Sequence, residues 1–411
     1  MDSKTLPAHP SLELYQKQAE DLVNIAESGD LDALRNVLRR IQHDHPQSGN
    51  LGNLPPTDAK PTLADAQLVI AREHGFESWP AFANHIEGLN CQTSAVAKFE
   101  SAVDAVVQGD VVKLEHLLRD NPELIHQRST FLHHATLLNY VGANGVENYR
   151  QKTPPNALQI AETLLRAGAD VNASAAIYGS SDTLGLAATS IFPCRAGLQN
   201  ALIDLLLEHG AKLNQGRLVR ACLANGRGAA AEHLAKRGAP LDLEAAAGVG
   251  RLDVVKTFFS EDGHLRPTAT VEQMQGGFVW ACEYGRTDVI GFLLDRGMPV
   301  DAMPYQVSGL HWAAYTARLD IVKLLLERKA PLDIRDGRHH GTPLGWALHA
   351  WNESAPEAAP TSTPSRQHEV VALLVAAGVS VDSALPSDLR SRELLIEKIR
   401  ADAHMLAALK W

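Results

Sequence analysis

The chain has 411 residues, with 38 Lys and Arg against 48 Asp and Glu, which gives a formal net charge of −10. Nucleic-acid binding needs a strongly basic face, so this balance argues against nucleic acid as the main partner and equally against an anionic membrane surface. No apolar run approaches the roughly 20 residues that a membrane-spanning helix needs.

The N-terminal end and the cysteines predict a cytoplasmic protein. Residues 1–7 lack the basic-then-apolar pattern of a secretory signal peptide. The cysteines lack the spacing of a metal site or a redox motif, which indicates free, buried thiols in a reducing compartment. They are Cys91, Cys194, Cys222 and Cys282. Glycine-rich stretches lack the context of a phosphate-binding loop, so neither a cofactor nor a metal is expected.

The first part of the chain predicts two helix pairs, at residues 12–41 and 63–89. Ser78 is expected to cap the last of these helices, because a serine side chain can accept from the free backbone N–H groups of a helix start. Residues 43–60 are rich in Pro, Gly and Asn and predict a linker. Both pairs depart from the pattern that follows, so residues 1–90 are interpreted as a divergent N-terminal helical cap.

From residue 91 onward, a unit of two helices and a turn recurs. Its second helix is rich in leucine and ends at a glycine. These glycines include Gly168, Gly210, Gly238 and Gly297. Such recurrence is typical of a stacked repeat array. Some units are longer than others, with insertions near residues 141–158, 191–197 and 352–366, and residues 385–411 predict a C-terminal helical cap.

Both halves of the unit match a known pattern. Residues 308–314 and 342–347 approach the first-helix motif T-P-L-H-x-A, and residues 168–172 read G-A-D-V-N, the usual end of the second helix. The chain therefore resembles the ankyrin-repeat family. The resemblance implies an all-α fold, an ankyrin-repeat solenoid of roughly ten helix pairs with divergent caps and an array over residues 91–384. It also implies binding of a protein or peptide, without naming the partner.

In ankyrin arrays the first helices and the turns line a concave face. Aligning the units places tryptophan at the same groove-facing position in consecutive repeats, at Trp280, Trp312 and Trp346. Other side chains expected on this face are Arg220, Tyr284, Tyr315 and His349. Either the rings pack together and stiffen the array, or they form an aromatic platform for a ligand, and both interpretations stay open.

The second candidate region is residues 131–178, the least regular part of the array. Its side chains suit acid–base chemistry, and they are His134, Tyr140, Glu147, Tyr149, Arg150 and Tyr178. If a reaction occurs, His134 and Glu147 are expected to carry protons while Tyr140 or Arg150 steadies an anion. His133 occupies the position at which the motif histidine bonds to the turn backbone, so a structural role is expected for it.

Two functions follow from these patterns. The first is a cytoplasmic recognition protein that binds a protein or peptide through its concave face. The second is a protein that binds a small organic ligand, or an unorthodox enzyme, which would use His134, Glu147 and Tyr140 together with the aromatic platform. No established catalytic motif occurs, which favours the first function. A purely structural role is a third alternative.

Overall fold

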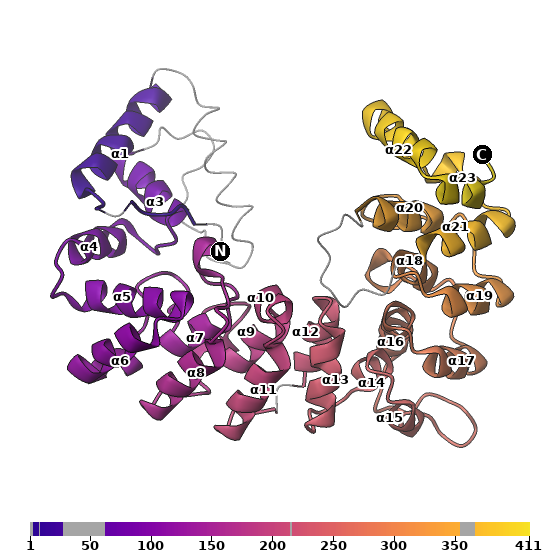
Figure 1. Cartoon of the computed structure of the whole chain (residues 1–411), viewed down its shortest axis with the longest axis horizontal. Coiled ribbons are helices and arrows are strands. Elements are labelled where there is room, and N and C mark those ends of the chain that lie inside the picture. Colours follow the sequence, from indigo (N-terminus) through magenta and orange to yellow (C-terminus); the bar gives the residue numbers. More distant parts are fainter. Residues whose placement is uncertain (1–2, 8, 28–61, 214–215, 354–365) are drawn as a thin grey trace. The chain divides into compact units, whose positions relative to one another are not determined.

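The computed structural model describes residues 3–7, 9–27, 62–213, 216–353 and 366–411. These ranges are largely α-helical and form two compact units, Met1–Lys212 and Leu213–Trp411, called unit 1 and unit 2 below. Within each unit, successive helix pairs are stacked on one another (Figure 1). The predicted all-α fold of stacked helix pairs is therefore confirmed.

Unit 1 combines helix pairs with two short 3-10 helices and a small hairpin. The hairpin strands are antiparallel, with Ser174 opposite Asp182. The elements in chain order are α1 (Leu12–Glu27), α3 (Leu63–Glu73), α4 (Trp79–Leu89), α5 (Ala95–Gln108), α6 (Val111–Asp120), η1 (Pro122–His126), α7 (Leu137–Val141), η2 (Asn148–Arg150), α8 (Ala157–Arg166), β1 (Ser174–Ala175), β2 (Ser181–Asp182), α9 (Thr183–Thr189), α10 (Ile191–Arg195) and α11 (Gln199–Glu208).

The helices at the N-terminal end of unit 1 pack around an aromatic core. These helices are α1, α3 and α4. The buried side chains of this core include Tyr15, Phe76, Phe82, Ile86 and Phe131. Ser78 caps α4 as predicted, because its hydroxyl accepts a hydrogen bond from the Ala81 N–H at 3.4 Å. The second half of the predicted pair at residues 12–41 and the predicted linker at residues 43–60 lie outside the described residues. The cap boundary at residue 90 stays a prediction.

Two of the three expected insertions contain regular structure. The one near residues 141–158 includes η2, which carries Arg150 into the interior of unit 1. The one near residues 191–197 forms the short helix α10, which Ser190 caps. Most of the third, near residues 352–366, lies outside the described residues.

Unit 2 continues the alternation of first and second helices. First helices α14, α16, α18 and α20 lie side by side, and α17, α19 and α21 lie on the other side (Figure 1). The elements in chain order are α12 (Leu218–Ala224), α13 (Gly228–Lys236), α14 (Leu243–Gly248), α15 (Leu252–Thr257), α16 (Val271–Tyr284), α17 (Thr287–Asp295), η3 (Pro304–Gln306), α18 (Gly309–Tyr315), α19 (Leu319–Glu327), α20 (Pro343–Glu353), α21 (Gln367–Ala376), η4 (Asp382–Ala384), α22 (Leu389–Ala401) and α23 (Ala403–Leu409).

The C-terminal segment at residues 385–411 contains two helices, α22 and α23, that meet at Asp402. The Asp402 carboxylate accepts hydrogen bonds from two backbone N–H groups in the first turn of α23, at 2.9 and 3.1 Å. It also accepts from the Trp351 indole at 3.2 Å and lies 3.0 Å from His368 Nε2. One carboxylate thus starts the last helix and ties it to α20 and α21.

Two arginines at turns of unit 2 connect their own repeats with the repeat before. Arg286 Nε donates to the Gly248 carbonyl at 3.1 Å, and Arg318 Nε donates to the Glu283 carbonyl at 3.2 Å. Each arginine side chain also covers the left-handed glycine just after the preceding first helix. These bonds satisfy carbonyl groups that the end of a helix leaves unpaired.

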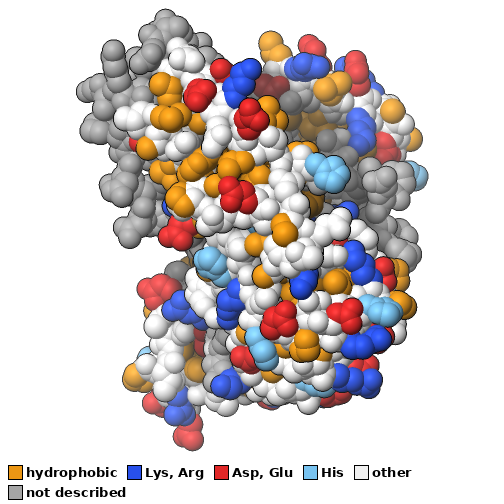
Figure 2. Space-filling view, turned by 90° about the vertical axis from the view of Figure 1, so that its left-hand side faces the viewer, with side chains coloured by type: hydrophobic (Ala, Val, Ile, Leu, Met, Phe, Trp, Pro, Cys, Tyr) orange, Lys and Arg blue, Asp and Glu red, His pale blue; other side chains and the backbone are white. Residues whose placement is uncertain are grey.

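The described surface has mixed character. Lys and Arg are interspersed with Asp and Glu on the face shown in Figure 2. Among the described helices, none combines the length and the apolar composition that crossing a bilayer requires. Cys222 and Cys282 are buried as expected, whereas Cys91 and Cys194 are exposed, so the expectation of buried thiols is wrong for those two.

Candidate functional site

Partly exposed aromatic rings meet on the first-helix side of unit 2. Trp312 and Tyr315 come from α18, and Trp346 and His349 come from α20. The ring centroids of Trp312 and Trp346 are 5.2 Å apart with planes at 81°, and those of Tyr315 and Trp346 are 5.8 Å apart at 75°. His349 lies 6.4 Å from Tyr315. We call these four side chains the aromatic surface.

Asp336 fixes the orientation of Trp346. Its buried carboxylate accepts the Trp346 indole N–H at 3.0 Å and three backbone N–H groups of the following turn at 2.7 to 2.9 Å. Burial alone would raise the pKa of Asp336, but these hydrogen bonds outweigh burial and lower it to about 2. Trp346 is therefore a structural residue as well as part of the aromatic surface.

Trp280 does not continue the predicted column, and this corrects the expectation of three neighbouring tryptophans. Its ring packs against Tyr305, with centroids 5.5 Å apart, and among the described residues no ring contact joins it to Trp312. Its indole N–H donates to Glu244 at 2.8 Å, and the Tyr305 hydroxyl donates to the same oxygen. Trp280 is only 8% exposed, so it offers little area to a ligand.

Two other predicted surface residues bond within unit 2. Arg220 donates to Glu244 at 3.1 Å and lies 3.3 Å from the Asp242 carboxylate. The Tyr284 hydroxyl donates to the Leu223 carbonyl at 2.5 Å, and its ring lies over Gly228, so it joins α16 to the α12–α13 pair. Sequence reasoning missed Tyr305, which lies in a turn with a left-handed backbone at φ 59.

Carboxylates lie close to the aromatic surface. Glu283 is 8% exposed, and among the described residues its Oε2 has no hydrogen-bond partner. Burial raises the pKa of Glu283 to about 7, although Tyr284 and Arg318 act in the opposite direction. Glu353 lies 3.3 Å from His349. Burial raises the pKa of Tyr315, and the charges of Glu353 and Glu283 add to the shift.

In unit 1, Arg150 is the centre of a buried group of acids. Its Nη1 donates to Glu100 and, at 3.2 Å, to Glu147, and its Nη2 donates to Asp104 at 2.8 Å. The Tyr140 hydroxyl donates to Glu147 at 3.3 Å. The Glu147 side chain is fully buried, and that of Glu100 is 8% exposed. The irregular segment thus folds its own arginine onto acids of α5.

The two buried glutamates titrate in opposite directions. Burial alone would raise the pKa of Glu147, but His133 and Arg150 outweigh burial and lower it to about 2. Burial dominates at Glu100 and raises its pKa to about 7, because Arg150 opposes it only in part while Glu147 adds to it. Of the two acids that share Arg150, burial therefore favours the protonated form of Glu100, whereas the charges around Glu147 favour its ionised form.

The histidine against Glu147 is His133 and not His134. His133 Nε2 lies 3.4 Å from Glu147 Oε2, and its Nδ1 accepts the Ala135 backbone N–H at 3.0 Å, which fits the structural role expected for it. The left-handed backbone of His134, at φ 47, turns its side chain outward, where Nδ1 lies 3.3 Å from the Ser129 carbonyl. The proposed acid–base pair of His134 and Glu147 is not brought together.

The other predicted residues of this segment, Tyr149 and Tyr178, contact Arg150 and Asn144. The Arg150 guanidinium lies over the Tyr149 ring, 5.4 Å from its centroid. Tyr178 is 60% exposed and donates to Asn144 at 3.0 Å. Since Glu147 and His133 are sealed from solvent, a substrate has no path to the proton-carrying pair, so the geometry does not favour catalysis there.

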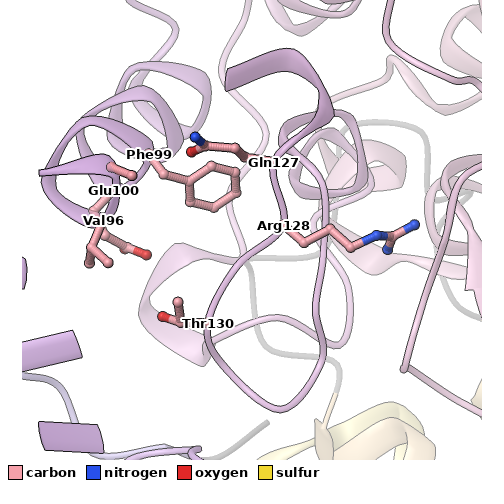
Figure 3. Close-up of a pocket in the computed structure, with 7 residues that line it drawn as sticks. Val96, Phe99, Glu100, Gln127, Arg128 and Thr130 are labelled. Carbon is pink, nitrogen blue, oxygen red and sulfur yellow. The ribbon is translucent and has the colours of Figure 1, made fainter. Parts of the chain in front are cut away.

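A cavity of about 160 Å³ opens beside Glu100 (Figure 3). Its walls come from the start of α5 and from the chain after η1. The lining residues are Ala95, Val96, Phe99, Glu100, Gln127, Arg128 and Thr130. Sequence reasoning did not find this cavity, because none of these residues forms a motif.

Stacked helix pairs with turn-to-turn bonds define a helical-repeat protein. Residues 243–336 match the family model described as ankyrin repeats (3 copies). Residues 243–336 therefore contain ankyrin repeats, and such repeats indicate a protein-interaction module. The ankyrin repeat domain of human ASB11 is a similar solved structure, with 19% identity, a TM-score of 0.34, and coverage of 68% of this chain and 98% of that chain. No curated protein matches.

Proposed function

We propose that this protein-interaction module binds a peptide segment carrying a basic side chain, and that it does so at the aromatic surface of unit 2. The observation that carries the proposal is the meeting of Trp312, Tyr315 and Trp346, three partly exposed rings set nearly perpendicular to one another. Aromatic residues are enriched at binding hot spots, because they offer a large contact area at a low cost in conformational entropy.

The charges beside the rings support a basic partner. The faces of Trp and Tyr rings attract a cation, and the attraction grows when the site excludes water. Glu283 adds a buried carboxylate oxygen that has no hydrogen-bond partner among the described residues, and the exposed Glu353 side chain lies next to His349. The formal net charge of −10 favours the approach of a positively charged segment.

Binding is tested on an array of immobilised random peptides probed with the full chain. We expect selected peptides to bind and Trp312→Ala or Tyr315→Ala to weaken that binding by about tenfold or more, which corresponds to about 1.4 kcal/mol. Trp346 is left intact because Asp336 depends on it. Trp411→Ala is the matched control, since Trp411 is 51% exposed and lies outside the aromatic surface.

Two results would overturn the proposal. One is that no peptide binds the wild-type chain above background. The other is that the Trp312→Ala and Trp411→Ala variants bind the selected peptides equally well, which would show that the contact lies elsewhere.

A further inference from the structure

The cavity beside Glu100 in unit 1 is lined by one acidic residue and by apolar side chains (Figure 3). Val96 and the ring of Phe99, from the same helix as Glu100, are part of the apolar lining. The Arg128 side chain lines the cavity but its guanidinium points away from it and donates to the carbonyls of His134 and Ser174 at 2.9 and 2.7 Å. The Arg128 guanidinium therefore does not neutralise Glu100 from the cavity side.

One of the two carboxylate oxygens of Glu100 can still accept a hydrogen bond. The residue is 6% exposed, and its Oε2 accepts a hydrogen bond from Arg150. Among the described residues, no donor to Oε1 is found. The Thr130 hydroxyl, which also lines the cavity, is 2.7 Å from His85 Nδ1 and is thus already paired. Glu100 Oε1 is therefore open to a hydrogen bond from a ligand donor in the cavity.

The charges around Arg150 are out of balance. Arg150 contacts the carboxylates of Glu100, Glu147 and Asp104, two of which belong to buried residues. One guanidinium cannot neutralise both buried carboxylates, so one of them lacks a full countercharge. A buried charge without a partner is costly, so the cluster is completed either by a proton on Glu100 or by a cation from the cavity.

We propose that this cavity binds a small organic cation, a primary ammonium with a short alkyl chain. The ammonium would donate to Glu100 Oε1, and the alkyl chain would lie against Val96 and Phe99. A cavity of about 160 Å³ suits a ligand of that size, since an engineered cavity of about 150 Å³ holds benzene. This site is independent of the peptide-binding surface proposed above.

Isothermal titration of the full chain with n-butylammonium tests the proposal, with butan-1-ol and butyrate as ligands of matched length. For five heavy atoms we expect a Kd on the order of 1 mM. Butan-1-ol and butyrate should bind at least about tenfold more weakly, because neither brings a positive charge to the carboxylate. Equal affinity for butylammonium and butan-1-ol would overturn the proposal, and so would no detectable butylammonium binding.

Glu100→Gln removes the charge while keeping the shape of the side chain. We expect it to weaken butylammonium binding at least about tenfold, whereas Glu115→Gln, at an exposed glutamate of α6, should leave it unchanged. Unchanged affinity in Glu100→Gln would refute the assignment.

The pH dependence of the wild-type chain gives a test that needs no variant. Since burial holds the pKa of Glu100 near 7, butylammonium should bind more weakly at pH 5.5 than at pH 8, and equal affinity at both would contradict the assignment.

Discussion

Replacing Arg150 tests whether the buried cluster of unit 1 holds that unit together. In Arg150→Met the apolar volume is largely kept, but Glu100 and Glu147 lose the cation that both contact. Removing one partner of a buried ion pair costs about 3–5 kcal/mol, because it leaves an uncompensated charge. We expect a loss of this size in the free energy of unfolding of unit 1 at pH 7, since Arg150 serves two buried acids.

Hydrogen exchange resolved by peptide is the suitable assay, because the two units need not unfold together. Protection should fall at residues 95–150 and stay unchanged at residues 309–353 of unit 2. The triple variant with Arg150→Met, Glu100→Gln and Glu147→Gln should recover much of the loss, since no charge then remains unpaired among these three. A cost below about 1 kcal/mol for Arg150→Met alone, or no recovery in the triple variant, would refute this reasoning.

The pH dependence of unit 1 follows from the same glutamates. Glu100 has a folded pKa of about 7, above the usual glutamate value of 4.5, so its burial costs stability above pH 7. This cost disappears as pH falls towards 4.5. Glu147 has a folded pKa of about 2, so its contribution is present above pH 4.5 and is lost as pH falls towards 2. Unit 1 should therefore be most stable near pH 5, and Glu100→Gln should remove the rise between pH 7 and 5.

Two further substitutions test unit 2. Asp336→Asn should cost about 2 kcal/mol at pH 7, because the folded pKa near 2 lies well below the usual aspartate value of 3.8. Urea titrations should show that the difference in stability shrinks as pH falls from 4 to 2. An undiminished difference at low pH would contradict this account. Gly228→Ala puts a Cβ 2.6 Å from the Tyr284 ring and should lower the free energy of unfolding by about 1–3 kcal/mol. Gly291→Ala, whose Cβ would have nothing within 4 Å, should cost no stability. Thermal unfolding measures both effects. Equal effects at the two glycines would refute the packing argument.

Local patterns in the sequence predicted most of the fold. Helix ends were readable because a left-handed glycine such as Gly168 ends the second helix, and a serine such as Ser78 starts a helix through its own hydroxyl. The contact between Trp312 and Trp346 also followed from sequence, since one repeat separates them and equivalent positions of stacked repeats are neighbours.

The contacts that the sequence did not predict depend on backbone turns outside the repeat pattern. Tyr305 covers Trp280 because two consecutive left-handed residues direct the chain back onto Glu244, which is 61 positions earlier. The left-handed backbone of His134 likewise decides that His133, and not its neighbour, faces Glu147. Non-glycine residues adopt this conformation too rarely for a pattern of residue types to predict it.

Two arginines, Arg286 and Arg318, each join a turn of unit 2 to the turn before it, and this has a consequence for how such a chain can change in length. Arg286 and Arg318 each reach the backbone carbonyl at the same place in the preceding repeat, so the bond depends on the carbonyl and not on the side chain that it meets. Removal of one whole repeat would present Arg318 with the carbonyl of Gly248, which Arg286 uses now. Gene duplication or deletion of single repeats can therefore preserve these junctions, and the length of the array is open to evolutionary change without new contacts being invented.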